Sequence, residues 1–417
     1  MGNKRVPELR FAGVAGDWER RKLGQLIKIS SAARVHKNEW TTSGVRFFRS
    51  SDVVSSFIGK KNIPAYISYS LYDELSKKSG LVQPGDLLVT GGGSIGIPYL
   101  VTDQEPLYFK DADLIWFKSA NKIDGYFLYY YFVTSQLRKY ISSITHIGTI
   151  SHYTIEQAKD TPIVLPKQVE QNLIGNLFKQ LDDTIALHQQ ELTTLKQTKQ
   201  GFLQKMFPKE GKSVPEVRFS GFTGNWEQRK LREMLAEPVT DGPHETPKLE
   251  ESGIPFISVD AIVDNQIDFD RKRGYISEET DELYSKKYRP QYHDVFLVKS
   301  GSTVGKTAIV ETKERFNIWS PLAAMRVGEV SDPYFLYFLL QTRKMQNQVK
   351  DKASSGTQPN LGMRELEKFH TQITPNLEEQ KKIGAFFQQL DNLITLHQRE
   401  LEALKKTKKA FLQKMFV

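Results

Sequence analysis

An internal duplication constrains the fold of this chain more than any other sequence feature. Residues 6–26 (VPELRFAGVAGDWERRKLGQL) match residues 214–234 (VPEVRFSGFTGNWEQRKLREM) at 12 of 21 positions, with an offset of 208. Residues 170–207 match residues 379–416 at 24 of 38 positions, with an offset of 209. Between these segments the two halves diverge. One module therefore occurs twice, with similar connecting parts and two globular parts whose surfaces differ.

Each copy of the module ends in a long helix with a heptad pattern. Seam residues alternate at spacings of four and three from Ile174 to Met206, and the second copy repeats this pattern from Ile383 to Met415. Two such seams can pair with each other. We expect His188 and His397 to be polar seam residues that help to fix the register, and not metal ligands. The expected helix-pairing residues are Leu181, Ile185, His188, Leu192, Leu195, Leu390, Ile394, His397, Leu401 and Leu404.

Short apolar and β-branched runs in both globular parts predict strands. Residues 45–48 correspond to 254–258, and residues 86–90 correspond to 295–299. A helical stretch follows from about Tyr126 and from Tyr334. The chain is therefore expected to be α+β, or mixed α/β, with two similar globular domains at residues 1–165 and 209–374. Conserved helices are expected at residues 166–208 and 375–417, which gives the chain a pseudo-twofold internal repeat.

Composition narrows the class of protein and favours a polyanionic partner. The chain has 58 Lys and Arg residues against 49 Asp and Glu, a formal net charge of +9, which favours nucleic acid without requiring it. Cysteine is absent, so disulfides, thiolate metal sites and a cysteine nucleophile are excluded. No run of about 20 apolar residues occurs, and residues 1–11 lack a signal-peptide pattern. We expect a cytoplasmic protein.

No sequence motif predicts catalysis by this chain. Gly301 to Thr307 (GSTVGKT) resembles a P-loop, but it has three residues between the first glycine and the Gly-Lys pair where four are required. A strand-connecting turn that presents Lys306 to a DNA phosphate is the better interpretation. A dinucleotide fingerprint, an amino-methyltransferase tetrapeptide and an HExxH zinc helix are all absent. The expected catalytic, metal and cofactor-binding residues are therefore none.

Polar residues in loops that flank the predicted strands are the candidates for DNA contact. Arg and Lys suit guanine edges, whereas Asn, Gln, Ser and Thr suit adenine or either purine. In the first globular part the candidates are Arg46, Arg49, Ser50, Ser51, His146, Thr149, Ser151 and His152. In the second they are Asp241, His244, Thr246, Lys248, Ser258, Arg271, Arg273, Lys306, Thr357, Gln358 and Asn360.

The whole chain resembles the DNA-specificity subunit of type I restriction-modification enzymes. The resemblance rests on the WERRKL and WEQRKL segments, residues 241–260 (DGPHETPKLEESGIPFISVD), the strand-and-glycine turns at 85–96 and 293–305, and the twin helices that end in FLQKMF. It implies two target-recognition domains, each reading half of a bipartite, gapped site. Residues 30–52 depart from the DGPHETP form, so a Gly-Pro-His contact is not carried over to the first domain.

The resemblance also implies partners and a role for the helices. The two helices would form an antiparallel coiled coil that sets the gap and docks two methyltransferase subunits, and restriction subunits would join this core. S-adenosylmethionine, ATP and magnesium would be bound by the partners, and this chain would bind no cofactor. Two other hypotheses fit less well. A chain that itself methylates or cleaves DNA would need motifs that are absent, and a coiled-coil adaptor would not need two divergent basic domains.

Overall fold

The computed structural model describes residues 6–110, 114–119, 122–145, 151–353 and 359–417. These residues pack into two compact units. Unit 1 comprises residues 1–189 and 399–417, and unit 2 comprises residues 190–398. Each unit thus combines one globular part with a segment of each long helix. The domain boundaries predicted at residues 165, 208 and 374 follow the sequence repeat and differ from the limits of these two units. These boundaries stay a prediction.

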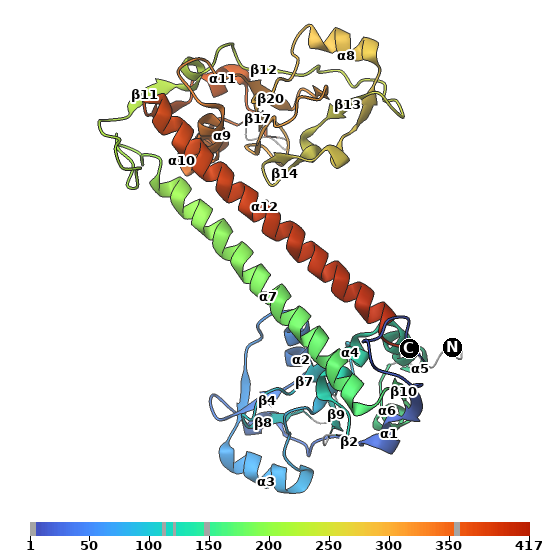
Figure 1. Cartoon of the computed structure of the whole chain (residues 1–417). Helices are drawn as coiled ribbons and strands as arrows, with labels where there is room; N and C mark the ends of the chain where they lie inside the picture. Colours follow the sequence, from blue (N-terminus) through green and yellow to red (C-terminus); the bar gives the residue numbers. More distant parts are fainter. Residues whose placement is uncertain (1–5, 111–113, 120–121, 146–150, 354–358) are drawn as a thin grey trace. The chain divides into compact units, whose positions relative to one another are not determined.

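The two long helices are α7 (Gln168–Lys205) and α12 (Leu377–Lys414), drawn in green and red in Figure 1. They run antiparallel within each unit. In unit 1, Phe178 of α7 contacts Phe416, which follows α12, with ring centroids 5.7 Å apart. In unit 2, Phe202 near the end of α7 contacts Phe386 near the start of α12, with centroids 5.1 Å apart. No helix in the described ranges is long and apolar enough to span a membrane.

The proposed seam residues lie at different depths in the two units. Leu192, Ile394 and Leu401 are buried, whereas Ile185, Leu195 and Leu404 are half-buried. Leu181 and Leu390 pack against the cores of units 1 and 2 respectively. In unit 1, His188 Nδ1 lies 3.7 Å from Glu400, and in unit 2 the same distance separates His397 from Glu191. The specific contribution of each residue to helix pairing stays a prediction.

A lysine–aspartate pair also joins the helices in each unit. In unit 2, Lys199 Nζ lies 2.7 Å from Asp391, and it donates a hydrogen bond of 3.2 Å to Gln341. In unit 1, Lys408 pairs with Asp182, which also accepts a hydrogen bond from the Tyr130 hydroxyl. Burial raises the pKa of Asp391, and the neighbouring Lys199 opposes this shift. Because these lysines lie in the apolar seam, the partner carboxylate compensates for their partial desolvation.

Unit 1 contains two four-stranded sheets. The first has the strand order β2 (Lys28–Ser30), β9 (Leu114–Lys118), β6 (Leu87–Thr90) and β7 (Pro98–Leu100). The second has the order β3 (Trp40–Thr41), β5 (Ala65–Ile67), β4 (Val45–Phe48) and β8 (Leu107–Phe109). A separate antiparallel pair joins β1 (Glu19–Lys22) to β10 (Pro162–Leu165). The helices are α1 (Leu23–Leu26), α2 (Ser50–Phe57), α3 (Tyr69–Ser79), α4 (Gly125–Val133), α5 (Ser135–Thr145) and α6 (Ile155–Asp160).

Unit 2 repeats the four-stranded sheet and the pair of terminal strands, but its second sheet has three strands. Its four-stranded sheet has the order β12 (Thr240–Asp241), β20 (Leu322–Met325), β17 (Val295–Val298) and β18 (Thr307–Ile309). Its second sheet has the order β16 (Gly274–Ile276), β13 (Ile254–Ile257) and β19 (Asn317–Ile318). Two antiparallel pairs are β14 (Ile262–Val263) with β15 (Gln266–Ile267), and β11 (Glu227–Lys230) with β21 (His370–Ile373). The helices are α8 (Glu278–Ser285), α9 (Pro333–Gln341), α10 (Arg343–Lys352) and α11 (Met363–Glu367). The predicted α+β class and the duplicated architecture are confirmed.

Buried ion pairs explain why the opening segment of each copy is so similar. In unit 1, Arg10 donates two hydrogen bonds, of 2.8 and 2.7 Å, to the buried Glu170 at the start of α7. In unit 2, Arg218 donates two, of 2.6 and 2.8 Å, to the buried Glu379 of α12. Such bidentate pairs fix both the distance and the orientation of their partners. They hold the first residues of each repeat against a long helix.

Residues at the end of a long helix complete the core of each unit. Met415 and Phe416 are buried in the core of unit 1, where the Phe416 ring contacts those of Phe127 and Tyr131. In unit 2, Phe207 occupies the equivalent position and contacts Trp226. The repeated FLQKMF sequence is therefore explained by two equivalent core sites.

Glycines inside the long helices allow close packing. A Cβ atom at Gly384 would lie 2.8 Å from Tyr334 Cβ and 2.9 Å from Asp332 Oδ1, both at the start of α9. Gly175 has the same position in unit 1, where a Cβ atom would lie 2.9 Å from Tyr126 Cβ. Replacement of either glycine would force α9 or α4 away from the long helix.

We expect Gly384→Ala to destabilise the protein although alanine favours helix. The gain in helix propensity, about 1 kcal/mol, is outweighed by overpacking, which costs ~1–3 kcal/mol. Gly201 in α7 is the matched control, because a Cβ atom there would have no neighbour within 4 Å and the second repeat has Ala410 at this position. Urea unfolding should show a lower midpoint for Gly384→Ala and an unchanged or higher one for Gly201→Ala. Equal shifts in both variants would contradict this.

We also expect Phe416→Ala to weaken unit 1 selectively. Removing a buried phenylalanine side chain costs about 3–5 kcal/mol. Hydrogen exchange measured by mass spectrometry should accelerate in β6 and β9, while the strands of unit 2 keep their protection. Phe207→Ala should give the reverse pattern. Similar losses of protection in both units from either variant would refute the assignment of these residues to separate cores.

Candidate nucleic-acid interface

A buried carboxylate organises a cluster of basic side chains in unit 2. Asp241 ends β12 and its side chain is fully buried. Lys287 pairs with it and also donates a hydrogen bond of 2.9 Å to the carbonyl oxygen of Gly242. Lys299 Nζ lies 3.3 Å from the same carboxylate, and His244 Nε2 lies 3.5 Å from it. One negative charge is thus shared by two lysines and a histidine.

The exposure of these side chains shows which ones can reach a ligand. The Lys299 side chain is 11% exposed, whereas those of Lys287 and His244 are 46% and 71% exposed. Two positive lysine charges face one carboxylate, so the cluster retains excess positive charge at the surface. Such a site suits an anion such as a DNA phosphate.

The backbone around this cluster is tightly fixed. A side chain at Gly242 would collide with the carbonyl oxygen of Ile318, and Ser320 donates a backbone hydrogen bond of 3.1 Å to Pro243. Burial raises the pKa of the Tyr284 hydroxyl on α8, and the nearby Glu245 carboxylate raises it further. The Gly242–Pro243 backbone that precedes His244 is therefore packed closely against residues 318–320.

An arginine lies close to the fixed backbone segment that contacts Pro243. The Arg273 guanidinium carbon is 4.1 Å from the centroid of the Trp319 ring, a cation–π arrangement. Arg273 is exposed, whereas Trp319 is half-buried. This stacking orients the arginine while leaving its edge accessible to solvent.

The other candidates in unit 2 are dispersed. Thr246 and Lys248 are exposed, and Lys248 lies 3.3 Å from Glu250. Arg271 lies 3.3 Å from Asp268, and Ser258 is buried. Asn360 is exposed, and its backbone forms an isolated antiparallel β-bridge with Ser300. Thr357 and Gln358 lie outside the described residues.

The glycine-rich segment at residues 301–307 connects β17 to β18. Gly301 and Gly305 have φ values of +91° and +93°, and the Gly305 amide donates to the Val298 carbonyl. Lys306 is exposed, and its Nζ atom lies 3.4 Å from the Ile262 carbonyl oxygen. The segment therefore has the geometry of a tight turn between neighbouring strands.

In unit 1 the two candidate arginines are held by a buried aspartate. Arg49 Nε donates a hydrogen bond of 2.7 Å to Asp52, and Arg46 Nη2 donates one of 3.2 Å to it. The arginine side chains are 30% (Arg46) and 24% (Arg49) exposed, and that of Asp52 is 2% exposed. Ser51 accepts a hydrogen bond from Asn62, so it also belongs to this network. Free rotation of either guanidinium toward a base would break these bonds.

Three further candidates of unit 1 lie within the described residues. Ser50 begins α2, and Ser151 and His152 precede α6, where His152 is exposed. His146 and Thr149 lie outside the described residues. Contact between DNA and any of the candidate residues stays a prediction.

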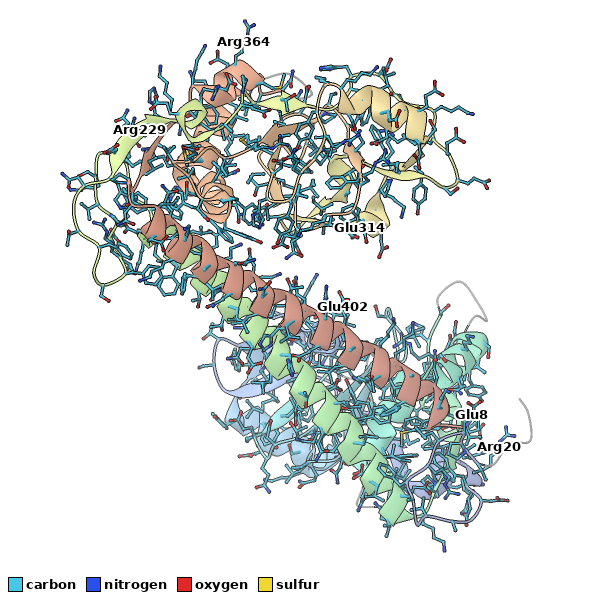
Figure 2. All side chains as sticks on the ribbon, turned by 45° about the horizontal axis from the view of Figure 1, so that its top comes forward. Glu8, Arg20, Arg229, Glu314, Arg364 and Glu402 are labelled. Atoms are coloured by element: carbon cyan, nitrogen blue, oxygen red, sulfur yellow. The ribbon has the colours of Figure 1, made fainter. Side chains whose placement is uncertain are left out.

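Sequence reasoning missed two of the cations around Asp241. Lys287 and Lys299 lie 46 and 58 residues beyond Asp241, and no local motif marks them. Other basic residues are scattered over the surface, for example Arg229 on β11 and Arg364 on α11, which point outward in Figure 2. Only the fold distinguishes the clustered lysines from these scattered ones.

Comparison with known proteins agrees with the duplicated architecture. Residues 15–197 and residues 223–406 each match the sequence family described as the type I restriction modification DNA specificity domain. The type I restriction enzyme MjaVIII specificity subunit of Methanocaldococcus jannaschii is 24% identical, over 98% of this chain and 92% of that protein. The putative MjaX specificity subunit of the same organism is 30% identical over 46% of this chain and 45% of its own length.

Solved structures share the fold at low sequence identity. The S subunit of a type I restriction-modification system from M. genitalium has a TM-score of 0.64 and 16% identity, with 99% of both chains covered. A chain from a study of complex assembly and conformational transition in the type I system has a TM-score of 0.52 and 18% identity, covering 96% of this chain and 97% of its own. Because the family match covers most of the sequence in two copies, this chain belongs to the type I restriction-modification DNA specificity family.

Proposed function

We propose that this chain is the DNA-specificity subunit of a type I restriction-modification complex, in which each unit reads one half of a bipartite, gapped site. The observation that carries the proposal is the contrast between the units. They share the strand order of one four-stranded sheet, yet a buried aspartate holds Arg46 and Arg49 in unit 1, whereas a different one holds Lys287 and Lys299 in unit 2. A common fold with two different cationic surfaces suits two different DNA sequences.

The long helices set the gap between the half-sites and dock two methyltransferase subunits. Support comes from surface residues that are identical in both repeats. Leu187 of α7 and Leu396 of α12 occupy equivalent positions and are 54% and 51% exposed. An apolar residue that is repeated on an exposed helix face suits two copies of the same partner.

The chain itself is not catalytic in this proposal. Methyl transfer, ATP hydrolysis and cleavage belong to the methyltransferase and restriction subunits, which bind S-adenosylmethionine, ATP and magnesium in the cytoplasm. The absence of methyltransferase, nucleotide-binding and zinc-hydrolase motifs from the sequence supports this division of labour.

Exchange of one globular part should change one half-site only. We expect that replacing residues 1–165 with the corresponding segment of another family member, in the presence of the methyltransferase partner, alters the first half-site and leaves the second unchanged. The readout is a genome-wide map of modified adenines. Cells that express the chain without its partner are the control and should show no modification. A simultaneous change in both half-sites would refute the modular assignment.

Lys287→Gln should weaken DNA binding in a salt-dependent manner. If Lys287 contacts a phosphate, the slope of log K against log salt should fall by about 1 unit, and affinity should drop similarly for all sequences. The adjacent Lys286, which is also exposed, provides the matched control Lys286→Gln. Fluorescence anisotropy with the complete complex measures both variants. An unchanged slope for Lys287→Gln would rule out the phosphate contact.

A further inference from the structure

A loop in unit 1 presents an isoleucine to solvent on a fixed backbone. The loop, residues 60–64, connects α2 to β5. Helix α2 is followed by Gly59 at a φ of +68°, and the Lys60 amide donates a hydrogen bond of 2.8 Å to the Ser55 carbonyl. This hydrogen bond and the left-handed glycine form a compact helix end. The direction in which the chain leaves α2 is therefore set locally.

The arginine network of unit 1 fixes the rest of the loop. Asn62 Nδ2 donates to Ser51 at 3.1 Å and to Asp52 at 3.3 Å. Arg49 Nη2 donates a hydrogen bond of 2.6 Å to the carbonyl oxygen of Ile63. Pro64 follows and restricts the preceding residue to extended conformations. A loop that is ordered before binding loses little conformational entropy when a ligand arrives.

The exposed side chains of the loop are two lysines and one isoleucine. Ile63 is 83% exposed, and Lys60 and Lys61 beside it are exposed as well. A single exposed isoleucine is ordinary on a protein surface. Here, however, the hydrogen bond from Arg49 to the Ile63 carbonyl oxygen holds the backbone from which the side chain projects.

The equivalent segment of unit 2 has the same net charge but carries its cations at different positions. The register of the sheets aligns the two loops. The strand after each loop ends opposite the first residue of the adjacent strand: Ile67 of β5 pairs with Val45 of β4, and Ile276 of β16 pairs with Ile254 of β13. The corresponding residues 269–273 (FDRKR) have Lys272 in the place of Ile63, and Phe269 and Asp270 in the places of Lys60 and Lys61. Two loops of the same net charge that carry different side chains are expected to differ in the bases that they contact.

We propose that residues 60–64 form a base-reading element of unit 1. Lys60 and Lys61 contact phosphates, and Ile63 packs against the methyl group of a thymine in the major groove. Arg46 and Arg49 are then positioning residues, because Asp52 holds them and Arg49 holds the loop. This inference rests on the proposed function and adds the residue and the base that it reads.

The test compares Ile63→Ser with the unaltered chain, each in complex with the methyltransferase partner. The bipartite site is first mapped from modified adenines, and the probe is a labelled duplex that carries this site. Each thymine of the first half-site and of its flanking base pairs is then replaced by deoxyuridine, which lacks only the methyl group. We expect one replacement to weaken binding of the unaltered complex about fourfold, equivalent to ~0.8 kcal/mol for one buried methyl-sized group. The same replacement should leave the affinity of Ile63→Ser unchanged.

Two controls separate this inference from the proposed function. Leu81→Ser changes an apolar residue that is 53% exposed elsewhere in unit 1, and it should bind like the unaltered chain. Thermal unfolding of Ile63→Ser should match that of the unaltered chain. If the unaltered complex shows no bipartite specificity, the proposed function fails. If it does, the thymine contact is overturned when no deoxyuridine replacement matters, or when Ile63→Ser remains equally sensitive to it.

Discussion

Each unit buries a phenylalanine that follows the far end of a long helix, Phe416 in unit 1 and Phe207 in unit 2. These rings lie among aromatic side chains of the globular part and of the opposing helix, so neither the globular fold nor the helix pairing is complete without the other. The bidentate pairs Arg10–Glu170 and Arg218–Glu379 attach the first residues of each repeat to the start of the other long helix in the same unit. The strong similarity of the repeats at these positions follows from packing, because each residue fills an equivalent site in its own unit.

This shared frame leaves other positions free to diverge. In both units a buried aspartate orients two partly exposed cations and offsets part of their charge, but the aspartate lies at a different place in each fold. Asp52 is in α2 of unit 1, whereas Asp241 ends β12 of unit 2. A buried carboxylate is costly without partners, so the paired cations are held in defined positions. The fold can therefore present different charged surfaces without a change of core, which is what a protein that recognises two different sequences requires.

Much of the architecture could be predicted from the sequence because a repeat and a heptad pattern report on long, regular packing. The α+β class, the duplication and both long helices follow from such signals. The site was less accessible. Arg46 and Arg49 are recognisable as basic residues in and directly after a predicted strand, but their attachment to Asp52 depends on how α2 follows β4. Lys287 and Lys299 are far from Asp241 in sequence, and the loop that carries Ile63 is held by hydrogen bonds from Arg49 and Asn62. Contacts of this kind arise from tertiary structure, which local patterns do not encode.

The central claim is that two similar units read two separate half-sites for a partner that modifies adenine. The most direct measurement is a genome-wide map of N6-methyladenine in cells that produce this chain together with its methyltransferase partner. The account predicts a single motif with two specific halves and a gap of constant length, modified in both halves. A continuous motif, a gap of variable length or modification that is independent of sequence would contradict it.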